Sequence, residues 1–243
     1  FAGPEILGKK LGVIGLGAIG ALVANSAAAL GMEVIGYDPF LSVKAALSLS
    51  PAVKFTDNLK DIFASCDYIT VHVPLLDSTK NMINKEALSS MKDGVRIMNF
   101  SRGGLVSDDD LLEAIEGGKV ACYVTDFPSG KLIGKEGIVA IPHLGASTPE
   151  SEENCAVMAA DEISDYLENG NITHSVNLPD LSAARSTDCR VCVIHKNLPD
   201  SLANISAALS GAGVSVAALL SKCRKGLAYT VADVDSNSAD FAS

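Results

Sequence analysis

The stretch Gly15-Leu16-Gly17-Ala18-Ile19-Gly20 decides the fold, because a glycine-rich turn here follows an apolar strand and opens an Ala-rich helix. In a G-x-G-x-x-G turn, the first glycine allows a tight turn, the second lets the backbone approach a pyrophosphate, and the third lets helix and strand pack closely. The pyrophosphate then lies at the helix N-terminus. Asp38, at the end of the next strand, can accept a hydrogen bond from a ribose 2′-hydroxyl and would repel a 2′-phosphate. This order predicts an NAD site; the alternative is a glycine-rich turn that binds no ligand.

On both sides of this turn, short apolar strands alternate with helical stretches from residue 11 to residue 141. Such alternation, with uninterrupted apolar runs, is typical of a parallel sheet that is buried on both faces. We therefore expect a doubly wound α/β domain of the Rossmann type over residues 1–150. The expected strands are 11–16, 33–37, 53–55, 68–73, 95–100, 121–125 and 138–141.

Helix boundaries in this domain carry their own signals. The Ala-rich stretch 19–30 is followed by Gly31, which suits the left-handed position just past a helix end. Ser107 can cap a helix that opens with three aspartates, and Asp110 stands at the capping-box spacing. Negative charge favours a helix N-terminus, so these aspartates need no metal ion, and we expect no metal site in the chain.

A longer helix and a linker come next. Thr148 can cap this helix and Pro149 suits its first position. The helix should run to about residue 168 and stop at Asn169-Gly170. The polar stretch 177–188 is typical of a linker, so residues 151–180 are expected to hold the helix and the start of the linker.

Residues 181–243 differ in character and indicate a second domain. A strand at 190–195, a helix from Pro199 to about residue 209, and strands at 214–220 and 227–234 give the order β-α-β-β. A ferredoxin-like module needs one more helix and strand, and only the start of that helix fits before Ser243. We therefore expect a partial ferredoxin-like α+β domain.

Composition narrows the class of protein. The 243 residues are 48% hydrophobic and 20% charged, which is a globular composition for one or two domains. The net charge of −10 disfavours nucleic acid and anionic membranes as partners, and no apolar run approaches the ~20 residues of a membrane span. Most of the six cysteines stand in apolar surroundings, as free buried thiols do, and Cys189 and Cys192 should face opposite sides of one strand. Free thiols of this kind are typical of a reducing compartment, so we expect the protein in the cytoplasm.

Residues that leave the strands at their carboxyl ends should meet at one sheet edge, where open parallel sheets bind ligands. Hydride transfer between a nicotinamide and a 2-hydroxyacid needs a cation that holds the carboxylate and a group that exchanges the hydroxyl proton. Arg102 and His143 can supply these, and Asp126 lies at the same edge. The alternatives are a surface salt bridge for Arg102 and a hydrogen-bonded histidine in a turn after Pro142 for His143.

Three segments resemble signatures of the D-2-hydroxyacid dehydrogenase family. Asn99-Phe100-Ser101-Arg102-Gly103-Gly104-Leu105-Val106 resembles N-x-[AS]-R-G-G-x-V, and Pro142-His143-Leu144-Gly145-Ala146-Ser147-Thr148 resembles P-H-[LIT]-G-[AG]-x-T. Tyr68-Ile69-Thr70-Val71-His72-Val73-Pro74-Leu75 looks like the segment that passes under the nicotinamide. The resemblance spans residues 1 to about 180 and implies an NAD-dependent oxidoreductase for a small 2-hydroxyacid. It also implies a further segment ahead of Phe1, without which the chain should bind NAD but turn over substrate poorly or not at all.

The resemblance also assigns roles to single residues. Arg102 would bind the substrate carboxylate and His143 would be the acid/base. His72 and His174 are interpreted as structural histidines. The residues implied in NAD binding are Gly15, Gly17, Ala18, Ile19, Gly20, Asp38, Val73, Pro74, Phe100, Ser101, Arg102, Asp126, His143, Gly145 and Ala146.

One family feature is missing from this sequence. The family usually places a glutamate just before a proline, after the strand that carries Asp126, and this glutamate pairs with the histidine. Here the segment reads Thr125-Asp126-Phe127-Pro128-Ser129-Gly130-Lys131, and counting puts Lys131 in the glutamate's place. Either Glu136 or Asp126 substitutes, or His143 works without a carboxylate partner.

The tail narrows the expected substrate. Residues 189–234 resemble an ACT domain, an amino-acid-sensing module, and Asn177-Leu178-Pro179 resembles the bacterial D-3-phosphoglycerate dehydrogenases of this family. The combination implies oxidation of D-3-phosphoglycerate in serine biosynthesis, a homo-oligomer, and L-serine as a possible effector. His195 and Asn197 match the family's serine contacts, whereas Ser215 and Asp200 stand where asparagine and glycine are usual.

Two other functions stay open. A glyoxylate or hydroxypyruvate reductase would share the NAD domain, but the ACT-like tail argues against it. An NAD-sensing binding module would share the fold, but Arg102 and His143 argue for an enzyme.

Overall fold

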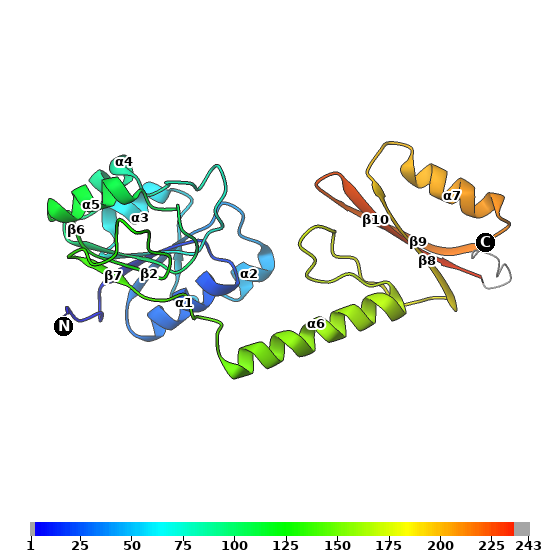
Figure 1. Cartoon of the computed structure of the whole chain (residues 1–243), viewed down its shortest axis with the longest axis horizontal. Helices are drawn as coiled ribbons and strands as arrows, with labels where there is room; N and C mark the ends of the chain where they lie inside the picture. The colour runs from blue at the N-terminus through cyan, green and yellow to red at the C-terminus, as the bar shows by residue number, and fades with distance from the viewer. Residues whose placement is uncertain (1–2, 236–243) are drawn as a thin grey trace. The chain divides into compact units, whose positions relative to one another are not determined.

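The computed structural model describes residues 3–235, and the chain divides into two compact units, Phe1–Gly145 and Ala146–Ser243 (Figure 1). The first unit holds all the strands expected up to residue 141, and the second begins just before the long helix. Across the described residues, no helix combines the length and the apolar character that crossing a membrane requires.

The first unit is built on a seven-stranded parallel sheet with the order β3-β2-β1-β4-β5-β6-β7. Strand β1 pairs with β2 on one side and with β4 on the other, so the chain reverses its direction of winding there. The predicted doubly wound parallel sheet is therefore confirmed, and every expected strand is found close to its expected ends. The strands are β1 Lys10–Ile14, β2 Glu33–Tyr37, β3 Lys54–Phe55, β4 Tyr68–Val71, β5 Val95–Asn99, β6 Val120–Thr125 and β7 Ile138–Ala140.

Helices cover both faces of this sheet, because neighbouring residues of a strand point to opposite sides. Val13 packs with Ala24 of α1 on one face. Ile14 belongs to the core on the other face together with Ile62 of α3, and all four side chains are fully buried. Figure 1 shows α1 on one side of the sheet and α3, α4 and α5 on the other. The helices are α1 Ala18–Ala29, α2 Val43–Leu47, α3 Leu59–Ser65, α4 Lys85–Ser90 and α5 Asp108–Glu116.

The helix boundaries confirm one predicted signal and correct another. Gly31 follows α1 with a φ of 85°, as expected. A capping box at α5 was the wrong interpretation of Asp110. The box would need the backbone N–H of Ser107, but that N–H donates to the carbonyl of Ile83. The Asp110 carboxylate instead accepts from the backbone N–H of Lys85 at 3.0 Å, which ties α5 to the start of α4.

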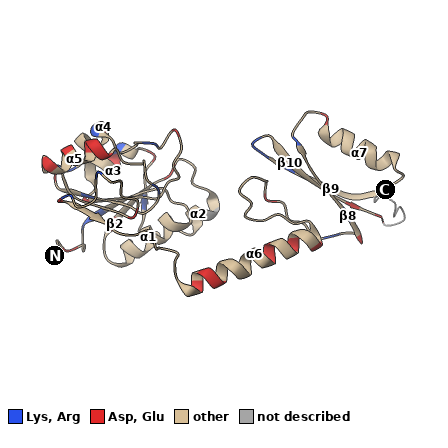
Figure 2. Cartoon of the chain, viewed as in Figure 1, with Lys and Arg blue, Asp and Glu red and all other residues tan. Residues whose placement is uncertain are grey.

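The second unit opens with α6, Pro149–Asn169, and continues with a three-stranded antiparallel sheet. Thr148 caps α6 by accepting from the N–H of Ser151 at 3.1 Å, and Gly170 ends the helix at a φ of 68°. Figure 2 shows acidic residues along α6, whereas α7 carries no charge over Ser201–Gly211. The predicted order β-α-β-β is confirmed, and the further helix expected before Ser243 lies outside the described residues. The strands are β8 Cys189–Lys196, β9 Val216–Arg224 and β10 Leu227–Val234, in the order β8-β10-β9.

The interpretation of residues 177–188 as a plain linker is corrected by the structure. Leu181 is only 1% exposed, and its backbone exchanges two hydrogen bonds with Ile172. Both side chains pack on Tyr229 of β10. The stretch is polar overall, but its leucine supplies enough apolar surface to fix it against the sheet.

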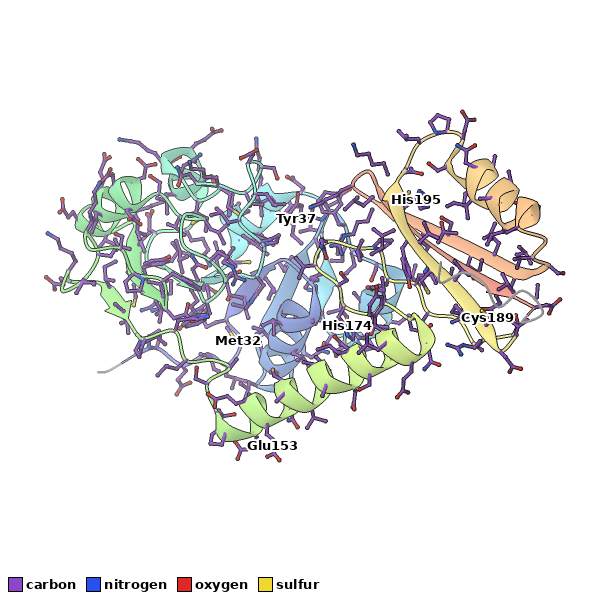
Figure 3. All side chains as sticks on the ribbon, turned by 45° about the vertical axis from the view of Figure 1, so that its right-hand side comes forward. Met32, Tyr37, Glu153, His174, Cys189 and His195 are labelled. Atoms are coloured by element: carbon purple, nitrogen blue, oxygen red, sulfur yellow. The ribbon has the colours of Figure 1, made fainter. Side chains whose placement is uncertain are left out.

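The cysteines are also more exposed than expected. Cys66 is buried, but Cys155, Cys192 and Cys223 are exposed. Cys155 lies on α6, a helix that buries none of its residues within the described structure. Cys189 packs into the core beneath α7, whereas the sulfur of Cys192 faces Gly170, so the two do face opposite sides of β8. Figure 3 shows Cys189 at one end of β8 and His195 near the other.

Candidate cofactor and catalytic site

The glycine loop, residues 15–20, connects β1 to α1, and two of its glycines are required by the fold itself. Gly15 has a φ of 95°, and a Cβ there would lie 2.5 Å from the carbonyl oxygen of His72. A Cβ on Gly20 would lie 1.9 Å from the carbonyl oxygen of Gly15. Gly17 differs, because its φ is −68° and a Cβ there would meet no atom of the described residues within 4 Å. The protein alone therefore gives no reason for a glycine at position 17.

Asp38 lies just beyond β2 and holds the glycine loop. One carboxylate oxygen accepts from the N–H of Leu16 at 2.9 Å, and the other accepts from the N–H of Phe40 at 2.8 Å. Each carboxylate oxygen can accept more than one hydrogen bond. The residue is thus fixed next to the loop and retains capacity for a ribose hydroxyl.

The segments that follow β4 and β5 are linked to each other. Ser101 donates its hydroxyl hydrogen to the carbonyl of Val73 at 2.9 Å, and Asn99 donates to the carbonyl of Arg102 at 2.9 Å. Phe100 is 40% exposed beside them. These bonds place the predicted contacts from both strands along one edge of the sheet.

Arg102 lies at this edge without a carboxylate partner among the described residues. Its guanidinium donates to the carbonyl of Ser101 at 2.7 Å. Among the described residues, Arg102 therefore does not form the surface salt bridge that the sequence left open as an alternative. An exposed guanidinium retains most of its donors for a planar anion such as a carboxylate.

His143 follows β7, and Asp126 follows the neighbouring strand β6. The imidazole Nδ1 lies 2.8 Å from Oδ2 of Asp126. The Asp126 side chain is 8% exposed, whereas that of His143 is 55% exposed. The ring of Phe127 lies with its centroid 4.4 Å from that of the imidazole. Sequence reasoning did not predict that Phe127 contacts the histidine. Its position directly after Asp126 and before Pro128 was the signal that could have indicated it.

Neither Lys131, which stands in the place of the missing glutamate, nor the candidate substitute Glu136 is hydrogen-bonded to the histidine within the described residues. The Nζ atom of Lys131 lies 2.7 Å from the carboxylate of Asp109, and this contact raises the pKa of Lys131. Glu136 is exposed, and among the described residues no hydrogen bond joins it to His143. Of the three possibilities left by the sequence, the structure contains the pairing with Asp126.

His72 has the structural position expected for it. Its Nε2 lies 3.0 Å from the hydroxyl of Thr70, and burial lowers its pKa. His174 lies beside α6, with its Nδ1 2.6 Å from the carboxylate of Glu162 (Figure 3).

The predicted effector residues lie in the second unit. His195 uses both ring nitrogens, one 2.9 Å from the carbonyl of Lys196 and the other 2.8 Å from the hydroxyl of Thr230. That hydroxyl also lies 2.8 Å from the hydroxyl of Ser221. Asn197 is exposed just past β8. Sequence patterns did not point to Thr230 and Ser221, because a polar pair in neighbouring strands becomes visible only once the register is known.

The remaining predicted contacts lie where their strands end. Ala18, Ile19 and Pro74 are exposed near the glycine loop and β4. Gly145 ends the first unit and Ala146 begins the second. Within residues 3–235, no group of three His, Cys, Asp or Glu side chains could hold a metal ion.

The first unit fits a dinucleotide on two structural grounds. The open space above Gly17 leaves room for a pyrophosphate at the start of α1. Among the described residues, no donor reaches the buried Oδ1 of Asp126, so this oxygen can accept a hydrogen bond from a ligand.

Comparison with protein families identifies the first unit. Residues 1–145 match the family described as D-isomer specific 2-hydroxyacid dehydrogenase, NAD binding domain. The D-3-phosphoglycerate dehydrogenase of Bacillus subtilis is 37% identical over 185 residues, which is 74% of this chain and 35% of that enzyme. The D-3-phosphoglycerate dehydrogenase of Haemophilus influenzae is 33% identical over 247 residues, which is 97% of this chain and 59% of that enzyme. The chain thus spans between about a third and three-fifths of these relatives.

Solved structures of D-2-hydroxyacid dehydrogenases and related reductases also align with this chain. The NAD-complexed D-isomer specific 2-hydroxyacid dehydrogenase of Lactobacillus delbrueckii ssp. bulgaricus aligns with a TM-score of 0.65 and 26% identity, over 72% of this chain and 58% of that one. A glyoxylate reductase aligns with a TM-score of 0.65 and 28% identity, over 72% of this chain and 54% of that one.

Proposed function

The chain belongs to the family of D-isomer specific 2-hydroxyacid dehydrogenases, and on this basis we propose that the full-length protein oxidises D-3-phosphoglycerate to 3-phosphohydroxypyruvate with NAD. The observation that carries the proposal is the arrangement at the sheet edge, where His143 pairs with Asp126 at 2.8 Å and Arg102 has no carboxylate partner among the described residues. A general base and a free guanidinium are the two groups that this reaction needs.

Each group then has a defined task. The glycine loop and Asp38 would hold NAD, which would supply the hydride acceptor for the substrate carbon. Arg102 holds the substrate carboxylate through its planar fork. Because Nδ1 of His143 faces the Asp126 carboxylate, Nε2 is the atom that accepts the hydroxyl proton. The glycine loop and Asp38 hold the pyrophosphate and the adenosine ribose.

The choice of substrate rests on similarity. The curated relatives are D-3-phosphoglycerate dehydrogenases, and the match to the Haemophilus enzyme extends over 97% of the chain, so it includes the ACT-like unit. This supports a place in serine biosynthesis, in the cytoplasm. The structural likeness to a glyoxylate reductase supports the second candidate, a reductase of unphosphorylated 2-oxoacids.

Serine control forms a separate part of the proposal. His195 would have to release Thr230 or Lys196 before either ring nitrogen could bind an effector. We therefore propose that L-serine inhibits this protein weakly, and that the ACT-like unit acts chiefly in assembling the homo-oligomer.

The test uses the full-length protein. We would follow NADH oxidation with 3-phosphohydroxypyruvate, glyoxylate, hydroxypyruvate and pyruvate, each with and without L-serine. We expect a kcat/KM for the phosphorylated acid that is at least about 100-fold above the others, since a site built for a phosphate strongly rejects ligands that lack it. A preference for an unphosphorylated acid would favour the reductase, and NADH binding without turnover would favour an NAD-sensing module.

A further inference from the structure

Phe127 contacts both parts of the proposed catalytic site, and we propose that it is a positioning residue that orients the imidazole of His143 for proton exchange. Its ring lies against the imidazole, and its Cβ faces the loop that carries Arg102. The inference rests on the proposed function, because it takes His143 as the acid/base and Arg102 as the group that holds the carboxylate. The side chain of Phe127 has no polar group, so it acts through these two residues.

The imidazole needs a second contact, because a single hydrogen bond does not fix the tilt of its plane. Nδ1 of His143 lies 2.8 Å from Oδ2 of Asp126, which holds one atom of the ring. The side chain is 55% exposed, so little else surrounds it. The Phe127 ring lies with its centroid 4.4 Å from that of the imidazole, and the two planes are inclined by 44°. Phe127 therefore determines the direction in which Nε2 points.

The backbone of Phe127 is itself held in place. Its N–H donates to the hydroxyl of Thr125 at 3.0 Å, and Thr125 is fully buried at the end of β6. Pro128 follows directly and restricts the residue before it to extended conformations. Leu132, which is 1% exposed, anchors the far end of the same loop in the core. The ring is thus presented to His143 from a fixed turn.

The loop that carries Arg102 lies against the same residue. A Cβ added to Gly103 would be 3.7 Å from the Cβ of Phe127, which is an ordinary contact distance. Asn99 holds this loop to the end of β5, because its side chain donates to the carbonyl of Arg102 at 2.9 Å. Phe127 meets the loop through its Cβ and the imidazole through its ring. The spacing between the guanidinium and the imidazole therefore depends on Phe127.

This contact takes on a task for which the sequence offers no second carboxylate. Lys131, which stands where a glutamate is usual, is bound to Asp109 at 2.7 Å and does not contact His143 within the described residues. Proton exchange requires the basic nitrogen to be close to the hydroxyl and well aligned with it. An aromatic ring provides alignment by shape, without adding a further charge beside the histidine.

The experiment compares Phe127→Leu and Phe127→Tyr with the wild-type full-length protein. Phe55→Leu is the matched control, because Phe55 is 53% exposed on β3. Phe127→Met, which keeps the volume but lacks a flat ring, replaces the leucine variant if thermal unfolding shows that the latter does not fold. The first readout is ¹³C relaxation of the Cε1–H bond of His143, assigned by its absence in His143→Gln.

We expect a rigid imidazole in the wild type, in Phe127→Tyr and in Phe55→Leu, with an order parameter of about 0.8. In Phe127→Leu it should fall below about 0.6, because the ring that fixes the imidazole plane is missing. An imidazole that stays rigid in Phe127→Leu would overturn the inference. This readout needs no turnover, so it gives an answer even if the protein uses none of the acids in the substrate panel.

The second readout is kcat on the acid that the substrate panel identifies as preferred. Phe127→Leu should lower kcat by about 10- to 100-fold while NADH still binds, since a misplaced general base costs turnover and leaves the glycine loop intact. Phe127→Tyr should restore most of the loss, and Phe55→Leu should show none. A kcat in Phe127→Leu equal to that of the wild type would also overturn the inference, without affecting the choice of substrate.

Discussion

At the scale of single residues, the three glycines of the loop differ in why a glycine is needed: two are required by the fold, and one leaves space for a ligand. Gly15 and Gly20 are enclosed by backbone atoms, whereas Gly17 faces open space. A glycine that the fold does not need indicates that something outside the chain approaches its backbone.

Replacing Gly17 with alanine should therefore leave the thermal unfolding temperature unchanged and weaken NADH binding by at least about tenfold, because the added methyl group would occupy the space of the pyrophosphate. Fluorescence titration with NADH and thermal unfolding of the full-length protein would measure both effects. Gly20→Ala is the contrast, because its Cβ would lie 1.9 Å from the Gly15 carbonyl oxygen and should destabilise the fold. Equal loss of stability in both variants would contradict this assignment.

His143→Gln should lower kcat on the preferred acid by about 10²- to 10⁴-fold, since the variant cannot exchange the hydroxyl proton. NADH should still bind, because the glycine loop and Asp38, which would hold its pyrophosphate and ribose, are untouched. Steady-state kinetics and NADH titration of the same preparation would check this. His72→Gln is the comparison, and turnover close to that of the wild type is expected there, because His72 lies beside Thr70 and not at the Asp126 carboxylate.

At the scale of secondary-structure elements, the end of α6 shows how one turn determines the position of a strand. Gly170 leaves the helix at a φ of 68°, and its carbonyl accepts from the hydroxyl of Tyr229 at 2.6 Å. A Cβ at this position would lie 2.4 Å from the sulfur of Cys192. The helix end and strands β8 and β10 are therefore packed through a glycine.

We expect Gly170→Ala to destabilise the second unit by more than Gly213→Ala. Gly213 has a similar φ of 73°, but no atom of the part of the chain that the structure describes lies within 4 Å of its Cβ position, so it measures the backbone strain alone, about 1 kcal/mol. The additional loss at Gly170 would come from the clash with Cys192. Hydrogen exchange of peptides from β8 and β10 would measure this additional loss of stability. Equal protection in the two variants would contradict the prediction, because it would show that the contact with Cys192 does not destabilise the unit.

The buried ion pair of the same sheet gives a prediction about pH. Arg190 donates to Asp233 at 2.6 Å, both side chains are at most 2% exposed, and Ser186 donates twice to the same carboxylate at 2.8 Å. These contacts hold the pKa of Asp233 well below its usual range. A carboxyl whose pKa is lower in the folded state stabilises that state above its unfolded pKa of about 4, and this stabilisation is lost as the pH falls further.

Asp233→Asn should therefore cost the second unit about 3 kcal/mol at pH 7, because Arg190 is left buried without its partner. The difference from the wild type should shrink as the pH falls below about 4, because the carboxyl of the unfolded wild-type chain then takes up a proton while that of the folded state is still ionised. Hydrogen exchange of β10 peptides at several pH values would measure both effects. Asp180→Asn, an exposed position, is the matched control, and a difference between wild type and Asp233→Asn that does not vary with pH would contradict the prediction.

At the scale of the whole molecule, sequence patterns predicted the strands and the parallel sheet because alternation and apolar runs are local signals. They did not reveal that Leu181 buries itself against Tyr229, or that the backbone of Ser107 is already bound to Ile83. Both depend on contacts between segments far apart in the chain. The same limit applied to the site: Arg102, Asp126 and His143 could be named from their motifs, but only the fold shows which carboxylate reaches the histidine.

The central position of β1 has a consequence for how the protein is made. β1 can pair with β2 early in synthesis, but its other neighbour β4 begins at Tyr68. Just before the glycine loop, the carbonyl of Ile14 accepts a hydrogen bond from the N–H of His72 at 2.7 Å, and this residue follows β4. Chains elongate at about 5–20 residues per second, so the loop waits several seconds for its support. Until that segment has left the ribosome, the proposed NAD site is incomplete. We therefore expect NAD to stabilise this unit only once β4 has paired with β1, and not to stabilise a nascent chain that stops before β4.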